Sequence, residues 1–131
     1  MNHKVLTIED QPDIRRLIRM TLEFKGFEVI EASDGVAGLA MARKDKPDLI
    51  LLDVMMPGMD GLSVARTLAV DPVLRHIPVV MLSALGAASD QSAGLEAGSR
   101  AYLVKPFSPW ELLDTVGALV AEPGGGTRQA V

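Results

Sequence analysis

Five short apolar runs alternate with longer stretches in which apolar residues recur at helical spacing, and this alternation constrains the fold more than any other feature. The runs are residues 5–8, 27–32, 49–52, 79–82 and 102–104. Five repeats of a strand followed by a helix are typical of a parallel sheet whose crossover helices cover both of its faces. The sequence therefore predicts an α/β fold, a three-layer sandwich around a doubly wound, five-stranded parallel sheet.

Start and stop signals place several elements within this plan. Pro12 suits the first turn of the first helix, and Gly26 ends that helix. The run 27–32 carries two glutamates, which favours an edge strand. The helix near residues 89–97 has the weakest propensity because its apolar residues are mostly alanine and it contains Gly94. Helical spacing predicts that one face of the first helix is formed by residues 14, 17, 18, 21 and 22.

Length and composition exclude several classes of protein. The chain has 131 residues, a net charge of −4, no cysteine and 48% hydrophobic residues, which fits a single globular domain. No apolar run is longer than four residues, so we expect a cytoplasmic protein with no membrane contact. The acidic balance argues against direct nucleic-acid binding. We expect the domain to span residues 1–121 and the glycine-rich residues 122–131 to form a flexible tail.

Polar side chains follow four of the five predicted strands. Glu9 and Asp10 follow the first, Asp53 the third, Ser83 the fourth and Lys105 the fifth. Each residue alone is compatible with an ordinary cap or turn. The carboxyl ends of parallel strands meet at one edge of a sheet, where open α/β folds bind ligands. The coincidence of all four segments therefore predicts one site.

The chemistry of this site follows from its charges. Two carboxylates about 5 Å apart repel by roughly 3 kcal/mol at an effective dielectric constant of about 20, so three of them require a cation. Hard oxygen ligands without histidine or cysteine select magnesium, or alternatively manganese. Such a cation commonly binds phosphate as well, with Lys105 and Ser83 available for two phosphate oxygens. One carboxylate is then free to act as a nucleophile.

At these positions the sequence resembles the receiver domain of bacterial two-component response regulators, of the single-domain chemotaxis type. The resemblance covers residues 4 to about 121. It implies a flavodoxin-like strand order, 2-1-3-4-5, and a signalling switch that catalyses only its own phosphorylation and dephosphorylation. The motifs that carry it are VLTIED at 5–10, LLDVMMPGMDG at 51–61, LSA at 82–84, Gly98 with Tyr102, and Lys105-Pro106-Phe107.

The resemblance assigns the phosphoryl acceptor and the metal ligands. Asp53 would receive a phosphoryl group from the phosphohistidine of a sensor histidine kinase or a phosphotransfer protein. Asp10, Asp53 and the backbone carbonyl of Met55 would bind Mg²⁺ directly, and Glu9 would act through water. Glu9 stands where aspartate is common in the family, and its longer side chain is expected to tune the metal affinity.

The resemblance also assigns the phosphate contacts and the switch. Lys105, Ser83 and the backbone amide of Ala84 would bind the phosphoryl group. Ser83, which stands where threonine is common, would act as a switch together with Tyr102. The peptide bond before Pro106 would be cis, as X-Pro bonds allow at little cost.

We expect the signal to leave through a protein contact with a downstream effector. The expected face combines the helix near residues 89–97, the strand 102–104 and the helix that begins near Pro109. Two alternatives remain. One is a pseudo-receiver scaffold that takes no phosphate, and the less favoured one is a haloacid-dehalogenase-like phosphatase, whose second aspartate two residues after the nucleophile is missing after Asp10.

A few other residues attract attention but carry no function in this interpretation. His3 and His76 follow no strand end and are expected to be solvated. Arg15 and Arg16 are assigned to the exposed face of the first helix. Trp110 fits equally well as half-buried core or as a contact with a partner.

Overall fold

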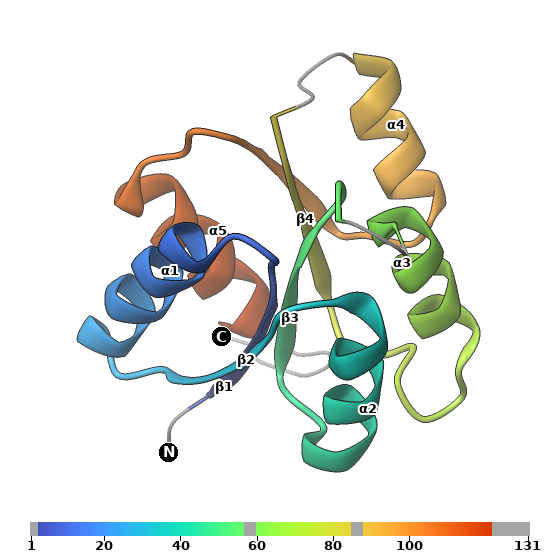
Figure 1. Cartoon of the computed structure of the whole chain (residues 1–131), viewed down its shortest axis with the longest axis horizontal. Coiled ribbons are helices and arrows are strands. Elements are labelled where there is room, and N and C mark those ends of the chain that lie inside the picture. The colour runs from blue at the N-terminus through green and yellow to red at the C-terminus, as the bar shows by residue number, and fades with distance from the viewer. Residues whose placement is uncertain (1–2, 57–59, 85–87, 122–131) are drawn as a thin grey trace.

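A computed structural model describes residues 3–56, 60–84 and 88–121, in which strands and helices alternate strictly (Figure 1). The strands are β1 (Lys4–Ile8), β2 (Glu28–Ala32), β3 (Leu49–Asp53), β4 (Val79–Ser83) and β5 (Ala101–Val104). The helices are α1 (Pro12–Phe24), α2 (Gly35–Asp45), α3 (Gly61–Val70), α4 (Ala88–Glu96) and α5 (Pro109–Ala121).

The five strands form one parallel sheet in the order β2-β1-β3-β4-β5. This order confirms the predicted topology and places β2 at an edge, as its two glutamates indicated. The chain reverses its direction of winding after β2, so β1 and β3 lie side by side at the centre, with Ile8 opposite Leu52. Ligand sites in open parallel sheets lie beyond the strand ends at such a point.

Helices cover both faces of the sheet, α1 and α5 on one and α2, α3 and α4 on the other (Figure 1). Side chains of β3 alternate between the two resulting cores because successive residues of a strand point to opposite faces. Leu49 and Leu51 pack in the core under α1 and α5, and Ile50 and Leu52 pack in the core under the other three helices. All four side chains are fully buried.

Local signals explain where the helices begin. Pro12 occupies the first turn of α1, as predicted. Asp34 and Asp60 cap α2 and α3 by accepting hydrogen bonds from backbone amides three residues ahead. Before α5, Ser108 and Glu111 each accept a hydrogen bond from the other's backbone amide.

The predicted apolar face of α1 is wider than the face that the structure buries. Ile18 and Leu22 are fully buried, but Leu17 is 46% exposed. Leu17 lies about 100° around the helix from Ile18, at the border between core and solvent.

No helix within the described ranges is long and apolar enough to cross a membrane. The predicted tail, residues 122–131, lies outside the described residues, as do residues 57–59 of the motif at 51–61.

Candidate functional site

The predicted site residues come together at the carboxyl edge of the sheet. Asp53 ends β3, directly across from Leu82 of β4. Glu9 and Asp10 follow β1, which is the neighbour of β3 on its other side. Ser83 ends β4, and Lys105 follows β5, where its backbone amide donates a 2.7 Å hydrogen bond to the Ser83 carbonyl. Segments far apart in the sequence thus contribute to one edge, as the sequence predicted.

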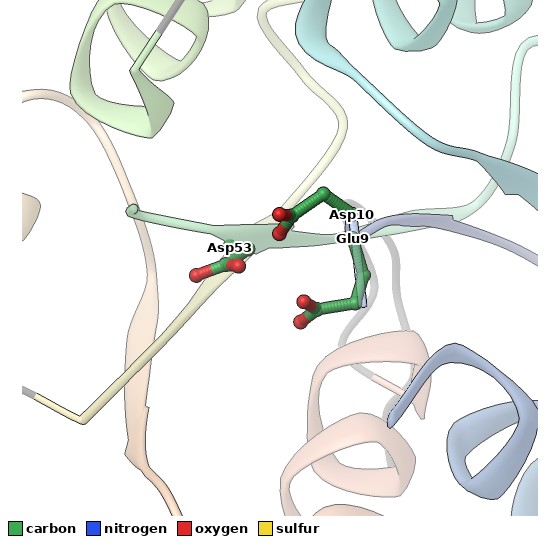
Figure 2. A group of neighbouring side chains, drawn as sticks. All are labelled: Glu9, Asp10 and Asp53. Atoms are coloured by element: carbon green, nitrogen blue, oxygen red, sulfur yellow. The ribbon is translucent and has the colours of Figure 1, made fainter. Parts of the chain in front are cut away.

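Three carboxylates form the centre of this site (Figure 2). Glu9, Asp10 and Asp53 each present an oxygen within 4.8 Å of the others, and Figure 2 shows Glu9 and Asp10 reaching from the end of β1 toward Asp53. Glu9 is fully buried and Asp53 nearly so, whereas Asp10 is partly exposed. A buried group of like charges favours either a bound cation or a retained proton.

The pKa of Asp53 reflects this crowding. Burial, and after it the adjacent Glu9 carboxylate, raise the pKa of the Asp53 carboxyl from 3.8 to about 7. Lys105 and the backbone amide of Met55 oppose the rise by favouring the charged form. That amide donates a 3.1 Å hydrogen bond to Asp53 Oδ1. Near neutral pH, the protein therefore holds Asp53 close to the midpoint between its neutral and ionised forms.

Lys105 bridges two of the carboxylates. Its Nζ lies 3.0 Å from Glu9 Oε1 and 3.4 Å from Asp53 Oδ2, and its side chain is only 14% exposed. The peptide bond between Lys105 and Pro106 is cis, as the resemblance implied. The sequence assigned Lys105 to the phosphate, and its pairing with Glu9 is an addition that the structure makes.

Arg15 also supports the site, although the sequence assigned it to an exposed helix face. Its Nη1 donates a 2.8 Å hydrogen bond to the Glu9 carbonyl, while its Nε pairs with Glu31 of β2 at 3.0 Å. Its side chain is 21% exposed, so the expectation was wrong for Arg15 but correct for Arg16, which is exposed. The Gln11 amide donates to Glu9 Oε2 at 3.2 Å. Nothing in the sequence pattern marks a contact between Arg15 and a backbone carbonyl.

Gly61 allows α3 to approach the strand that carries Asp53. A Cβ atom at this position would lie 2.3 Å from the Asp53 carbonyl oxygen and 2.7 Å from the Cα atom of Val54. Both contacts are to backbone, which cannot rotate away as a flexible side chain can. The Gly61 amide also donates a 2.8 Å hydrogen bond to the Val54 carbonyl. Only glycine therefore allows α3 to begin this close to the Asp53 backbone.

The remaining predicted residues surround this centre. Ser83 is buried at the end of β4, whereas Ala84 is exposed beside it. Tyr102 is partly buried on β5, and a Cβ atom on Gly94 of α4 would lie 3.1 Å from its ring. Met55, whose carbonyl the resemblance assigns to the metal, follows Asp53 with its side chain 60% exposed.

The donor set fits a hard divalent cation. Carboxylate oxygens from Glu9, Asp10 and Asp53 are the ligands that Mg²⁺ prefers, and the described residues place no imidazole among them. Mg²⁺ usually keeps several waters and binds through only one or two protein carboxylates together with phosphate. Glu9, Asp10 and Asp53 are thus suitable ligands, and the magnesium site itself stays a prediction.

Comparison with known proteins identifies the family. The model of the response regulator receiver domain matches residues 5–117. The chain is 45% identical over 119 residues to the response regulator PleD of Caulobacter vibrioides, which covers 91% of this chain and 26% of PleD. It is 40% identical over 126 residues to the phosphate regulon transcriptional regulatory protein PhoB of Pseudomonas aeruginosa, which covers 96% of this chain and 55% of PhoB.

A solved structure agrees with both matches. The chemotaxis response regulator CheY4 of Vibrio cholerae superposes with a TM-score of 0.86 at 34% identity, covering 91% of this chain and 99% of CheY4. By contrast, the chain spans only about a quarter of PleD and about half of PhoB. The strand order, the carboxyl-edge site and these matches together show that the chain belongs to the response regulator receiver domain family.

Proposed function

We propose that this chain is a phosphorylation-activated switch that accepts a phosphoryl group on Asp53. The donor would be the phosphohistidine of a sensor histidine kinase or of a phosphotransfer protein, and the transfer would take place in the cytoplasm. The observation that carries the proposal is the position of Asp53, which ends a central strand within reach of Lys105 and beside two further carboxylates. Receiver domains are signalling switches, and the proposed catalysis is limited to this chain's own phosphorylation and dephosphorylation.

The transfer step needs Asp53 in its ionised form. One carboxylate oxygen would attack the phosphorus, forming a P–O bond as the P–N bond to the imidazole breaks, and the imidazole nitrogen would keep the electron pair of that bond. Asp10, Asp53 and the Met55 carbonyl would hold Mg²⁺ directly, and Glu9 would act through water. The positive charge supplied there would offset the charge on the phosphoryl oxygens. Burial and Glu9 raise the pKa of Asp53 to about 7, and a bound cation would favour its ionised form.

Lys105 would exchange partners during this step. Its Nζ pairs with Glu9 at 3.0 Å and with Asp53 at 3.4 Å. A phosphoryl group on Asp53 adds oxygens with more negative charge than a carboxylate. Lys105 would move to one of these oxygens, and Glu9 would turn to the water shell of the metal.

Ser83 and Ala84 would bind the other phosphoryl oxygens and start the conformational change. One hydrogen bond from the Ser83 hydroxyl to an ionised oxygen contributes about 1.5–3 kcal/mol, less than the roughly 5.5 kcal/mol needed to reverse a 1:99 equilibrium. Lys105 and the Ala84 amide must therefore contribute as well. The effector would bind the face formed by α4, β5 and α5.

Tyr102 supports this choice of face. Its ring packs against α4 at Gly94, and its strand, β5, leads directly to Lys105. Movement at Ser83 or Lys105 would therefore reach α4 through a ring that lies beside that helix. Hydrogen exchange with a phosphoryl mimic and Mg²⁺ should change most over residues 85–102. Changes confined to α1 and α2 would contradict this output face.

Incubation with a small acyl phosphate and Mg²⁺, followed by intact-mass measurement, tests the acceptor. We expect a gain of one phosphoryl group that EDTA prevents and that Asp53→Asn abolishes. Ser83→Ala should keep the mass gain but show a smaller change in hydrogen exchange. No mass gain in the wild-type protein would favour the pseudo-receiver scaffold. Rapid release of phosphate over many turnovers would favour the phosphatase.

A further inference from the structure

The surface formed by α1 and α5 exposes large apolar side chains that the candidate site does not use. Phe24 is 85% exposed, Trp110 73%, Met20 63% and Leu17 46%. Phe24, Met20 and Leu17 belong to α1, and Trp110 lies in the first turn of α5. Single exposed apolar residues are ordinary, but four on adjacent helices form a patch of the kind that marks interaction sites. We call this surface the α1–α5 patch.

The α1–α5 patch is hollow at its centre. A groove of about 450 Å³ runs between the two helices, which lie on the same face of the sheet (Figure 1). Its walls are apolar apart from Thr21 and Lys25. The patch therefore combines protruding rings with a groove that could receive a ring from another molecule. The lining residues are Leu17, Met20, Thr21, Phe24, Lys25, Pro109, Trp110 and Leu113.

The size of the α1–α5 patch fits a protein surface. A Phe or Trp side chain buries about 150–250 Å² when it is covered, so Phe24 and Trp110 alone expose roughly 300 Å². Stable protein interfaces bury about 800 Å² on each partner. The rest of this area would come from Leu17, Met20 and the polar residues around them.

Two charged side chains of opposite sign flank the patch. Arg16 lies next to Met20 around α1, and Asp114 lies one turn after Trp110 on α5. Both are exposed, and neither forms an ion pair within residues 3–56, 60–84 and 88–121. A twofold rotation about an axis through the groove brings the α1 edge of one molecule onto the α5 edge of the other. Arg16 then faces the partner's Asp114 twice in the pair.

We propose that the α1–α5 patch pairs two copies of this chain around a twofold axis. Phe24 or Trp110 of each copy enters the groove of the other, and two symmetric pairs of Arg16 with the partner's Asp114 fix the orientation. A surface that carries Arg16 on one side and Asp114 on the other is complementary to itself in this arrangement. The proposal does not depend on phosphorylation of Asp53, and the unphosphorylated protein is expected to form the pair.

Sedimentation of the wild-type protein from about 1 µM to about 1 mM tests the association itself. We expect a reversible monomer–dimer equilibrium. Trp110 is the only tryptophan of the chain, so its emission should shift to shorter wavelength as the protein concentration rises and the ring is buried. A protein that stays monomeric over this range contradicts the proposal, and the patch then serves a different protein.

Charge reversal tests the symmetry. Arg16→Glu alone and Asp114→Arg alone each create two like-charged pairs across the axis and should weaken association about tenfold or more. An equimolar mixture of the two single variants should associate again, as should the variant that carries both changes. A binding surface for a different protein predicts no such recovery. Failure of both recoveries places the interface elsewhere.

Two variants that each remove one exposed apolar side chain, one inside the α1–α5 patch and one outside it, form a matched pair. Phe24→Ser should abolish the association, whereas Val70→Ser should leave it unchanged. Val70 is 77% exposed, nearly as much as Phe24, but it ends α3 on the opposite face of the sheet. Equal loss in both variants means that general hydrophobicity drives association, which contradicts a defined interface.

Discussion

Lys105 lies closer to Glu9 than to the proposed phosphoryl acceptor, with its Nζ 3.0 Å from Glu9 Oε1 and 3.4 Å from Asp53 Oδ2. Glu9 is fully buried, so Lys105 is the cation that compensates its charge within the described part of the chain. The same ammonium group therefore serves two carboxylates, and its loss affects both.

Lys105→Met should destabilise the metal-free protein by about 3 kcal/mol at neutral pH, because it leaves the buried Glu9 carboxylate without a cationic partner. Glu9→Gln combined with Lys105→Met removes both charges and should recover at least half of that loss. Urea unfolding with EDTA present measures both variants. If the double variant is as unstable as the sum of the single variants, the two residues do not form a coupled pair.

The metal-free protein should lose stability as the pH rises. The pKa of Asp53 is raised from 3.8 to about 7, so the folded protein binds this proton more tightly than the unfolded chain does. The resulting stabilisation is complete below about pH 4 and is lost as the pH passes through about 7. In the presence of EDTA, the urea midpoint should fall as the pH rises from about 5 to about 8. With Mg²⁺ present, the midpoint should change less over this range, because the cation takes the place of the proton. Asp53→Asn should flatten the EDTA curve, and an unchanged slope would contradict the origin of the effect.

Gly61→Ala should lower stability by about 1–3 kcal/mol and slow phosphorylation of Asp53. The added Cβ atom would lie 2.3 Å from the Asp53 carbonyl oxygen, so α3 or β3 must move. Gly117→Ala is the matched control, because a Cβ atom on that α5 residue meets nothing within 4 Å. It should raise stability by roughly 0.5–1 kcal/mol. Thermal unfolding and the intact-mass assay report the two effects, and similar behaviour of both variants would rule out the close approach.

Thr7→Val should stabilise the protein by about 1 kcal/mol. The Thr7 hydroxyl is fully buried in β1 and has no hydrogen-bond partner among the described residues, so a methyl group of the same shape removes an unsatisfied polar atom. Thr67→Val should give no such gain, because the Thr67 hydroxyl donates a 3.0 Å hydrogen bond to the Ser63 carbonyl. Equal changes in the two urea midpoints would show that the Thr7 hydroxyl does have a hydrogen-bond partner.

The features that follow from local patterns could be predicted from the sequence. The apolar runs gave the strands, the two glutamates of residues 27–32 indicated the edge position of β2, and the polar residues after four strands predicted the site. These features depend on periodicity and on the shared direction of parallel strands. Neither needs knowledge of individual side-chain contacts.

The features that depend on side-chain reach could not be predicted. Arg15 lies on a helix with charged neighbours, and only the packing of α1 against β2 brings it to the Glu9 carbonyl and to Glu31. The pairing of Lys105 with Glu9 joins residues 96 positions apart. Trp110 stayed undecided between core and contact because a first-turn residue can face either way, and the structure leaves it 73% exposed.

The sheet divides the interior into two cores that share no side chain, one under α1 and α5 and the other under α2, α3 and α4. Substitutions in separate cores should have nearly additive effects, because distant sites without common neighbours couple weakly. Related chains can therefore change the residues under α1 and α5, and with them the outer surface of these helices, while the packing beneath α4 stays the same. Such a division lets a receiver acquire new binding partners on one side without retuning the response on the other.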